Sequence, residues 1–478
     1  MISYAPGEGQ NGPGAPDDWP VPRARGPVSA VVRLPGSKSM TNRALVLAAL
    51  SDRSTLINGP LVARDTGLMA GALSALGCQI TEVGEAWQVE PAPLGRSAPP
   101  GGPERTGPGR PAQARVDQAR VDQDRVHQNC IDIDVGNAGT VLRFLPPVAA
   151  LSDADVRFRG DARVSKRPVG PLLTALRALG ATVSDGGTGA VPFVVRGRGS
   201  VPGGTVTLDA SSSSQLVSGL LLAAARFGAG AEIRHSGPPM PSAPHIEMTV
   251  RMLRSAGVDV RAGNGNGRLV MPSWRVMPGP ISADRIDVEP DLSNAVPFMA
   301  AALVTGGEII VTGWPADSLQ PAARIIELLR SMGADVHLGD AGLRVSGSGT
   351  IHGIAADLSE VGELTPVLTA LAALASSPSE FTGIGHLRSH ESDRLAALAG
   401  EIGKLGGDVT ELDDGLRIRP VPLRGSGVTF DSHDDHRLVM AAAVLGLVTG
   451  GLRLRNAATV AKTFPEFSQS WTQMLASR

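Results

Sequence analysis

The sequence predicts an α/β fold made of two similar domains, each containing three repeated units with the order strand, helix, strand, helix, strand, strand. The first observation is a recurring segment in which a short polar or Gly/Ser loop leads into an apolar, Ala/Leu-rich stretch. The second is an amphipathic stretch that ends at glycine and runs into a strand-like segment. The third is the spacing of the copies, about 70–80 residues after a longer first gap. A fixed spacing of this kind is typical of folds built from one repeated unit.

The apolar stretch that follows each polar loop predicts the first helix of a unit. Its residues are apolar nearly all round, so we expect this helix to be buried. The copies are GSKSMTNRALVLAAL (36–50), GNAGTVLRFLPPVAAL (136–151), SSSQLVSGLLLAAA (212–225), DLSNAVPFMAAALV (291–304), GELTPVLTALAALA (362–375) and DDHRLVMAAAVLGLV (434–448). Six copies divide naturally into three and three, which favours two domains facing each other across a cleft.

The amphipathic stretch predicts a second, outer helix in each unit. Glycine after the last helical turn is a common stop because it tolerates the left-handed backbone conformation. We expect the polar face of these helices to cover the outside of the protein. The segments are 73–80, 172–183, 249–260, 327–336 and 401–409, and a C-terminal helix is expected over 464–478.

Composition limits the classes of partner. The chain has 478 residues, with Lys+Arg 44 against Asp+Glu 46, a formal charge of -2. This balance gives no bulk attraction to nucleic acid or to an anionic membrane, and one Tyr with five Trp offers few stacking platforms for single strands. No apolar run is long enough for a transmembrane helix, and Met1–Pro27 lacks the apolar core of a signal peptide. Cys78 and Cys130 have no metal-type spacing, and two cysteines indicate a reducing compartment.

Two segments have the composition of disordered chain. Residues 1–27 are rich in Gly and Pro with acidic residues, and we expect a disordered tail there. Residues 92–128 join a Pro/Gly-rich stretch to a pentad repeat, ARVDQARVDQDRVHQ (114–128), which lengthens the first gap. We expect this insertion to be a disordered surface loop.

Polar and basic residues gather at the loops that precede the buried helices. Such helix starts present free N–H groups and a partial positive charge, so several together form an anion-binding site. Each loop taken alone is also compatible with an ordinary helix cap carrying solvated charges. The candidates are Lys38, Ser39 and Arg43; Asn137, Gly139, Thr140 and Arg143; Arg167; Ser213, Ser214 and Gln215; His386, His390, Glu391 and Arg394; Asp435, His436 and Arg437; and Lys462. His386 and His390 without HExxH or a cysteine cluster do not predict a metal site.

The motifs LPGSKSMTNRALVLAAL, GNAGTVLRF, SKRP, SSSSQ, HESDR, DDHR and AKTFP, in this order, resemble the 5-enolpyruvylshikimate-3-phosphate synthase family, from about Leu34 to Phe467. The resemblance implies an inside-out α/β barrel architecture of the enolpyruvyl transferase type, with two domains that close on substrate. It places two crossings between domains near Gly36 and Glu289. We therefore expect the first domain at 37–288, with the insertion 92–128, and the second at 28–36 plus 289–478.

The resemblance also implies a reaction. The enolpyruvyl group of phosphoenolpyruvate passes to the 5-hydroxyl of shikimate 3-phosphate with release of phosphate, by addition and elimination through a tetrahedral intermediate. Glu363 is implied as the base, and Lys38 and Glu391 as the groups that handle protons. Phosphoenolpyruvate is expected to contact Lys38, Gly139, Arg167, Gln215, Arg394, Arg437 and Lys462. Shikimate 3-phosphate is expected to contact Lys38, Ser39, Arg43, Ser213, Ser214, Gln215, Ser242, Glu363 and His390.

Several positions depart from the family pattern. Many members carry Asp at the position of Glu363, Asn at His386, Lys at His390 and Tyr at His245. If His390 contacts the phosphate of the substrate, binding is expected to weaken as pH rises through the titration range of this histidine.

Two other functions share features with this sequence. The related enzyme acting on UDP-N-acetylglucosamine uses a cysteine acid in a mobile loop, and neither Cys78 nor Cys130 fits that position. A non-catalytic polyanion-binding homologue would lose Lys38, Glu363 and Glu391, which are present. We expect a cytoplasmic monomer that binds two small-molecule substrates and no nucleic acid, membrane, cofactor or metal.

Overall fold

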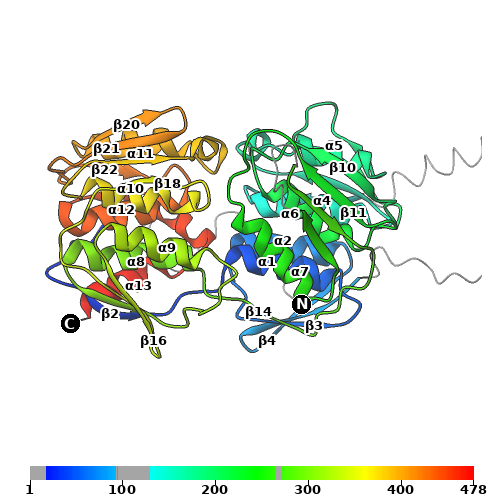
Figure 1. Ribbon diagram of the computed structural model, residues 1–478, viewed down its shortest axis with the longest axis horizontal. Helices are drawn as coiled ribbons and strands as arrows, with labels where there is room; N and C mark the ends of the chain where they lie inside the picture. The colour runs from blue at the N-terminus through cyan, green and yellow to red at the C-terminus, as the bar shows by residue number, and fades with distance from the viewer. Residues whose placement is uncertain (1–17, 93, 95–129, 264–270, 478) are drawn as a thin grey trace, which may run out of the picture.

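The computed structural model describes residues 18–92, 94, 130–263 and 271–477, which form two halves lying side by side (Figure 1). Each half has its own cluster of buried hydrophobic side chains. One cluster draws on residues from Met40 to Ala283. The other combines residues 19–34 with residues 292–474. We call these the first half and the second half.

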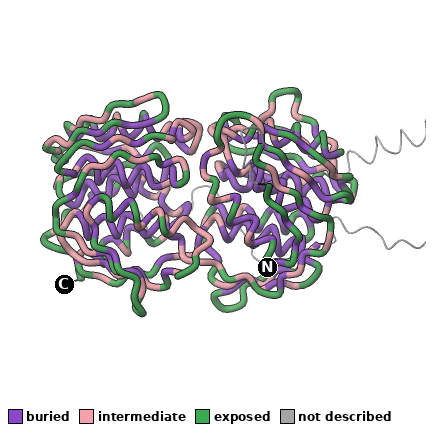
Figure 2. The backbone as a smooth tube through the Cα atoms, viewed as in Figure 1, coloured by how far each residue is buried: buried purple, intermediate pink, exposed green. Residues whose placement is uncertain are grey.

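The helices that follow the polar loops are buried inside each half, as the apolar sequence predicts (Figure 2). In α4, for example, every residue is buried. These inner helices are α1 (Lys38–Ala49), α4 (Gly139–Ala149) and α6 (Gln215–Ala224) in the first half, and α8 (Leu292–Thr305), α10 (Thr365–Ala373) and α12 (His436–Thr449) in the second. Because each inner helix lies within its half, its N-terminal loop is held at a fixed position by the core.

The amphipathic stretches form the outer helices α2 (Arg64–Ala75), α5 (Gly170–Ala178), α7 (Pro244–Ser255), α9 (Ala322–Ser331) and α11 (Arg394–Lys404). In α9 the buried residues are Ile325, Leu328 and Leu329, and the polar residues of the helix, such as Arg324 and Glu327, lie outside this buried set. The glycine after each outer helix has a positive φ, which confirms the predicted stops. These glycines are Gly77, Gly180, Gly257, Gly333 and Gly406, with φ from 81° to 103°.

Five four-stranded sheets share one topology, in which one parallel pair is followed by two antiparallel pairings. In the first half they are β14 (Arg285–Asp287), β3 (Thr55–Asn58), β5 (Ala86–Glu90) and β4 (Gln79–Val83); β6 (Cys130–Asp134), β7 (Asp155–Arg159), β9 (Phe193–Arg196) and β8 (Thr182–Ser184); and β10 (Gly204–Leu208), β11 (Ala231–His235), β13 (Ser273–Val276) and β12 (Val260–Gly263). In the second half they are β2 (Ser29–Val32), β15 (Glu308–Val311), β17 (Gly342–Ser346) and β16 (Asp335–Gly339); and β18 (Ala355–Asp357), β19 (Ser379–Thr382), β21 (Gly415–Arg419) and β20 (Asp408–Leu412).

The inner helices pack against one another in the middle of each half, and the sheets and outer helices lie around them. Over the described residues the sheets remain separate, and no continuous hydrogen-bonded barrel closes around a half. The α/β class and the repeated unit predicted from the sequence are confirmed.

The sixth sheet corrects the prediction of a disordered tail over 1–27. Its strands are β22 (Thr429–Asp431), β23 (Arg453–Arg455) and β1 (Asp18–Pro20), and β1 pairs antiparallel with β23. Trp19 is buried against Phe467 of α13 (Phe467–Ala476), with ring centroids 6.4 Å apart. The Gly/Pro-rich composition concealed two apolar residues, Trp19 and Val21, that the second half buries. Residues 1–17 lie outside the described residues, as does all of the insertion 92–128 except residues 92 and 94.

The two halves exchange segments where the chain crosses between them. Strand β2, near the start of the chain, pairs in parallel with β15 of the second half. Strand β14 returns to pair in parallel with β3 of the first half. The two crossings lie side by side, because Gly36 and Pro290 form an isolated antiparallel bridge. Among the described helices, none is both long and apolar enough to span a bilayer.

Candidate active site

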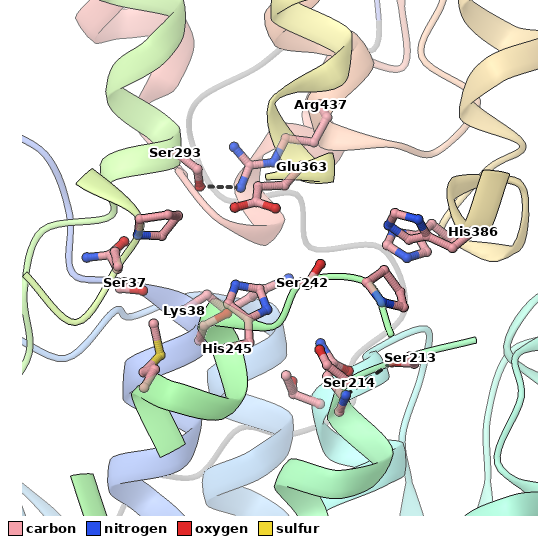
Figure 3. A pocket seen from close by; sticks show the side chains of 18 of the residues that line it. Ser37, Lys38, Ser213, Ser214, Ser242, His245, Ser293, Glu363, His386 and Arg437 are labelled. Carbon is pink, nitrogen blue, oxygen red and sulfur yellow. Dashed lines mark hydrogen bonds between the residues drawn. The ribbon is translucent and has the colours of Figure 1, made fainter. Parts of the chain in front are cut away.

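A cavity between the halves gathers the N-terminal ends of all six inner helices or the turns before them. Its walls include Lys38 of α1, Thr140 of α4 and Gln215 of α6, facing residues of the second half. From that side come Leu292 of α8, Glu363 before α10, and His436 of α12. Figure 3 shows Lys38, Ser213, Ser214 and Ser242 on one wall and Glu363 and Arg437 on the other. The six repeated units therefore converge on one cavity, as the sequence predicts.

Most of the predicted site residues line this cavity. They are Lys38, Ser39, Arg167, Ser213, Ser214, Gln215, Ser242, Glu363, His390, Glu391, Arg394 and Arg437. Five further residues line the cavity: Thr140, Arg143, His245, His386 and His436. The sequence analysis named these residues but assigned no ligand to them.

Three predicted residues lie just behind the cavity wall. Lys462 is buried, and its Nζ lies 3.0 Å from Glu391 Oε1. A Cβ built on Gly139 would lie 2.8 Å from Arg143 Nη1 and 3.2 Å from Arg167 Cζ, so glycine leaves room for two guanidinium groups. Arg43 is fully buried, and its side chain donates to Thr249, to the carbonyl oxygens of Ser39 and His245, and to Ser218. Its guanidinium also lies over the ring of Phe144, 5.0 Å from the centroid.

Glu391 is the centre of a buried charge cluster that joins the halves. Its carboxylate lies 3.0 Å from Lys462 Nζ, 3.1 Å from Arg394 Nη2 and 3.6 Å from Arg167 Nη2. Arg167 belongs to the first half and the other three residues to the second. Burial alone would raise the pKa of Glu391, but Lys462, Arg167 and Arg394 together hold it well below the ordinary carboxyl value. Glu391 is therefore ionised and balances cations that would otherwise repel one another.

Lys38 has a carboxylate partner that the sequence did not reveal. Its Nζ lies 3.3 Å from Oδ2 of Asp65, a buried residue in the first turn of α2. Lys462 Nζ lies 3.9 Å from the same oxygen. Burial lowers the pKa of Lys38, the Asp65 charge opposes this shift, and the Lys462 charge adds to it. A lysine whose ammonium form is weakened in this way is suited to exchanging a proton.

Glu363 lies on the opposite wall, in the second half. It belongs to the 3-10 turn η2 (Gly362–Leu364) that leads into α10, and it lies beside Arg437 in Figure 3. Burial raises the pKa of Glu363 above its ordinary value, while Arg437 and Arg394 act in the opposite direction. A carboxyl group with a raised pKa can accept a proton more readily than an exposed glutamate.

The arginines of the second half are held by fixed partners. Arg394 donates to Asp435 at 2.8 and 3.2 Å, and Asp435, which is fully buried, also caps α12 by accepting from the Arg437 N–H. Arg437 donates to Ser293 Oγ at 2.7 Å and to Asn294 Oδ1 at 3.2 Å. These contacts fix the direction of both guanidinium groups before a ligand arrives.

The first half contributes hydroxyl and amide groups on two loops. Ser213 and Ser214 precede α6, and Gln215 at its start accepts a hydrogen bond from Arg143 at 3.0 Å. Ser242 lies on the loop before α7 and has a φ of 54°, which non-glycine residues rarely adopt. Its backbone N–H donates to the carbonyl oxygen of Ser359 in the second half, at 2.7 Å. This contact holds a strained loop against the opposite half.

The histidines that depart from the family pattern line the cavity in neutral form. Burial lowers the pKa of His245 to about 3 and that of His386 to about 4. Burial, then the Arg394 charge, also places the pKa of His390 well below its ordinary value. We therefore expect His390 to titrate at a lower pH than an ordinary histidine, because burial and Arg394 disfavour the charged ring.

Asp65, Asp291, Ser293 and Gln320 are site residues that sequence reasoning missed. Asp291 and Ser293 line the cavity at the fourth loop and helix copy, which has no basic residue. Their place in the repeat is the signal that would have found them. Asp65 and Gln320 lie outside the repeated loops and follow no motif, so only the fold brings them to the site.

Comparison with solved structures identifies the class of this arrangement as that of the enolpyruvyl transferases. An EPSP synthase from Acinetobacter baumannii matches with a TM-score of 0.73 and 25% identity, over 96% of this chain and 98% of that chain. The enolpyruvyl transferase NikO from Streptomyces tendae shares the fold, with a TM-score of 0.66 and 18% identity over 95% and 96% of the two chains.

Sequence comparison narrows the class to one family. The family model described as EPSP synthase (3-phosphoshikimate 1-carboxyvinyltransferase) matches residues 22–103 and 113–471. A 3-phosphoshikimate 1-carboxyvinyltransferase from Kocuria rhizophila is 47% identical over 470 residues, 97% of this chain and 98% of the relative. The chain belongs to the EPSP synthase family, and it is an enzyme, a transferase.

Proposed function

We propose that this enzyme transfers the enolpyruvyl group of phosphoenolpyruvate to the 5-hydroxyl of shikimate 3-phosphate, releasing phosphate, in the shikimate pathway to aromatic amino acids. The observation that carries the proposal is one cavity in which cations and hydroxyl groups from both halves face Glu363. Family membership supports the same reaction. Both substrates are small anions, and the buried cations supply the charge that they require.

Phosphoenolpyruvate fits the part of the cavity that joins the two halves. We assign it to Lys38, Arg167, Gln215, Arg394, Arg437 and Lys462, with Gly139 leaving space beside Arg167. Here the carboxylate and phosphate would replace some of the contacts that Glu391 and Asp65 now make with Lys38, Arg167 and Lys462. Arginine suits both groups, because its planar guanidinium can donate two hydrogen bonds to a pair of carboxylate or phosphate oxygens.

Shikimate 3-phosphate fits the hydroxyl-lined wall. We assign it to Lys38, Ser39, Ser213, Ser214, Gln215, Ser242, Glu363 and His390. Arg43 supports this wall from behind by holding the backbone of Ser39 and His245. Direct contact between Arg43 and the ligand stays a prediction.

The chemistry needs a base near the attacking hydroxyl and an acid near the methylene carbon of phosphoenolpyruvate. We assign the base to Glu363, whose raised pKa suits proton removal. Lys38, whose ammonium form is weakened by burial, gives the proton that the methylene carbon gains in addition, and the ionised Glu391 is the group that accepts a proton in elimination. Charge that develops on the departing phosphate is stabilised by Lys38, Arg167 and Lys462.

We infer that 37–288 forms one domain and that 28–36 with 289–478 forms the other, and that they close on substrate. Several contacts already cross between them. Arg251 donates to Asp317 at 2.9 Å, and Arg163 donates to the carbonyl oxygen of His390 at 3.4 Å. We further propose that the enzyme is a cytoplasmic monomer. We also propose that it binds neither nucleic acid nor a membrane.

A phosphate-release assay tests the proposed reaction. Release is expected with phosphoenolpyruvate and shikimate 3-phosphate together, and none with either alone or with UDP-N-acetylglucosamine in place of shikimate 3-phosphate. Cys78 is buried and Cys130 exposed, and neither lines the cavity, so no cysteine acid serves the second acceptor there.

Lys38→Ala tests the site. The variant is expected to lose about 10³-fold or more in kcat/KM, since it removes a charge and a proton carrier together. Lys166→Ala is the matched control, because Lys166 is an exposed lysine next to Arg167. Full activity of Lys38→Ala would reject the assigned site.

A further inference from the structure

His235, which the sequence analysis did not single out, lies behind the hydroxyl-lined wall and touches both of its loops. It is the last residue of β11 and is 4% exposed. Strands β10 and β11 are parallel neighbours, with Leu208 opposite His235. The loop after β10 leads to Ser213 and Ser214, and the loop after β11 leads to Ser242. The imidazole ring is therefore placed where the two serine loops leave the sheet.

Both ring nitrogens of His235 are engaged, one with each loop. The backbone N–H of Ala210 donates to Nδ1 at 3.2 Å. Nε2 lies 2.9 Å from the carbonyl oxygen of Pro238. Since Nδ1 accepts a hydrogen bond, the proton is on Nε2, which donates to Pro238. The neutral ring is thus fixed in one tautomer by two backbone groups from different loops.

The contact with Ala210 continues to the cavity through the backbone. The carbonyl oxygen of Ala210 accepts from the N–H of Ser213 at 3.0 Å. Ser213 Oγ in turn accepts from the Gln215 N–H at 3.3 Å. Asp209 stabilises the same turn by accepting from the Ser211 N–H at 2.8 Å. His235 therefore sets the position of the backbone that carries Ser213.

On the other loop, the ring holds Pro238, four residues before Ser242. A Cβ on Gly237 would lie 2.8 Å from Asp209 Oδ1, so the two loops also touch here. Ser242 has its strained φ of 54° and donates its N–H across to Ser359. The two serine positions thus depend on one side chain that reaches neither the cavity nor the substrate.

We propose that His235 is a positioning residue that couples the two serine loops and so determines the affinity for the phosphate of shikimate 3-phosphate. The inference rests on the proposed function, because it names that phosphate as the ligand of the loops. A phosphate remote from the reacting carbon binds equally in the ground state and the transition state. Loss of the coupling therefore raises KM for shikimate 3-phosphate and leaves kcat unchanged.

The two nitrogens are not equivalent, and this gives a sharp test. Ala210 is fully buried, so its N–H has no water to replace Nδ1, whereas Pro238 is exposed and its carbonyl oxygen can bind water. In His235→Asn the side-chain oxygen lies near the position of Nδ1 and keeps the contact with Ala210. In His235→Gln the amide nitrogen lies near the position of Nε2 and keeps only the contact with Pro238. His235→Leu keeps neither.

Steady-state kinetics with saturating phosphoenolpyruvate measure the effect. KM for shikimate 3-phosphate is expected to stay within about three-fold of the parent in His235→Asn and to rise about ten-fold or more in His235→Gln and His235→Leu. The value of kcat should stay within about two-fold in all three. His337→Asn, which changes an exposed histidine of β16, is the matched control. Thermal unfolding midpoints are measured for each variant.

Equal KM values in the parent, His235→Gln and His235→Leu would overturn the proposal, as would His235→Asn and His235→Gln being equally impaired. If His235→Leu does not fold, the Asn and Gln pair decides the question, because only their difference reports on Ala210. A parent that releases no phosphate from the two substrates rejects the proposed function. An active parent with insensitive His235 variants rejects this inference alone.

Discussion

The two halves have the same repeated fold but present different chemistry to the cavity. The first half offers mainly hydroxyl and amide groups, such as Ser213 and Ser242, on loops whose backbone is held by neighbouring loops. The second half offers charges that are already paired, such as Arg394 with Asp435. Neutral hydrogen-bond donors on loops with a fixed backbone favour recognition of a substrate. Charged groups held in fixed positions instead stabilise the charge that develops during the reaction. The comparison teaches that one repeated unit can serve either task, depending on what its loop carries.

Among the substitutions that test this comparison, the largest effect should come from removing the base of the second half. Glu363→Gln is expected to lower kcat about 10³-fold with little change in KM, because a base acts mainly in the transition state. Glu360→Gln is the control, since Glu360 is exposed and lies three residues earlier. A larger change in KM than in kcat would assign Glu363 to substrate binding. The division of tasks between a binding half and a reacting half would then not hold.

The same residue gives a pH prediction. Burial raises the pKa of Glu363 above its ordinary value. A base must be ionised, so kcat should fall as pH decreases through this raised pKa, at a higher pH than an exposed glutamate would show. The pH dependence of kcat measures this limb. If the residual activity of Glu363→Gln still falls at the same acidic pH, then a group other than Glu363 titrates there.

Next in size is the stability that the paired charges give to the second half. Asp435→Asn leaves the buried Arg394 with Glu391 as its remaining carboxylate, and is expected to cost about 3 kcal/mol of unfolding free energy. Urea unfolding followed by circular dichroism measures the loss. Asp434→Asn is the control, since Asp434 is exposed and asparagine tolerates its positive φ of 57°. Equal stability of the two variants would mean that the charge pairs of the second half are not structural.

A smaller effect, confined to affinity, is expected in the first half. Ser213→Ala and Ser214→Ala should each raise KM for shikimate 3-phosphate about ten-fold, the amount typical of a lost hydrogen bond to a charged group, with kcat unchanged. Ser200→Ala, at an exposed position of the same half, should change neither constant. A fall in kcat as large as the rise in KM would give these hydroxyls a part in the reaction.

The smallest effect concerns His390, where the halves meet. Its pKa is lowered by burial and by Arg394, so the ring is neutral at pH 7, and protonation toward acid pH should strengthen phosphate binding. The ratio of KM for shikimate 3-phosphate between His390→Asn and the parent should be constant from pH 7 to pH 9, and should rise only at pH values below the range in which an ordinary histidine titrates. The ratio also cancels titration of the substrate itself. A ratio that already changes above pH 7 would show that the ring titrates in its ordinary range.

The repeated fold was predictable from the sequence because its signals are local. Apolar stretches after polar loops mark the inner helices, and glycines such as Gly180 and Gly333 end the outer ones with positive φ. Strand β1 was not predictable, since its partner β23 lies more than 400 residues away and its neighbours have the composition of a disordered tail.

The candidate site was predictable where a motif carried it, as at Lys38 and Arg394. Asp65 follows no motif, and only packing of α2 against α1 brings it to Lys38. Arg43 shows a different difficulty. Its spacing from Ser39 predicts a shared helical face, and Arg43 does donate to the Ser39 carbonyl oxygen, yet the side chain continues inward to Thr249. Helical spacing gives a face of the helix and does not tell which neighbour the end of a long side chain meets.

The exchange of strands between the halves has a consequence for the newly made protein. The first half is a continuous stretch of chain closed by β14, so all of its strands have been synthesised once about 290 residues are made. By contrast, β2 must wait for β15, and β1 must wait for β23, close to the end of synthesis. The earliest part of the polypeptide is therefore among the last to find its partner, and an N-terminal truncation would damage the half that is translated later.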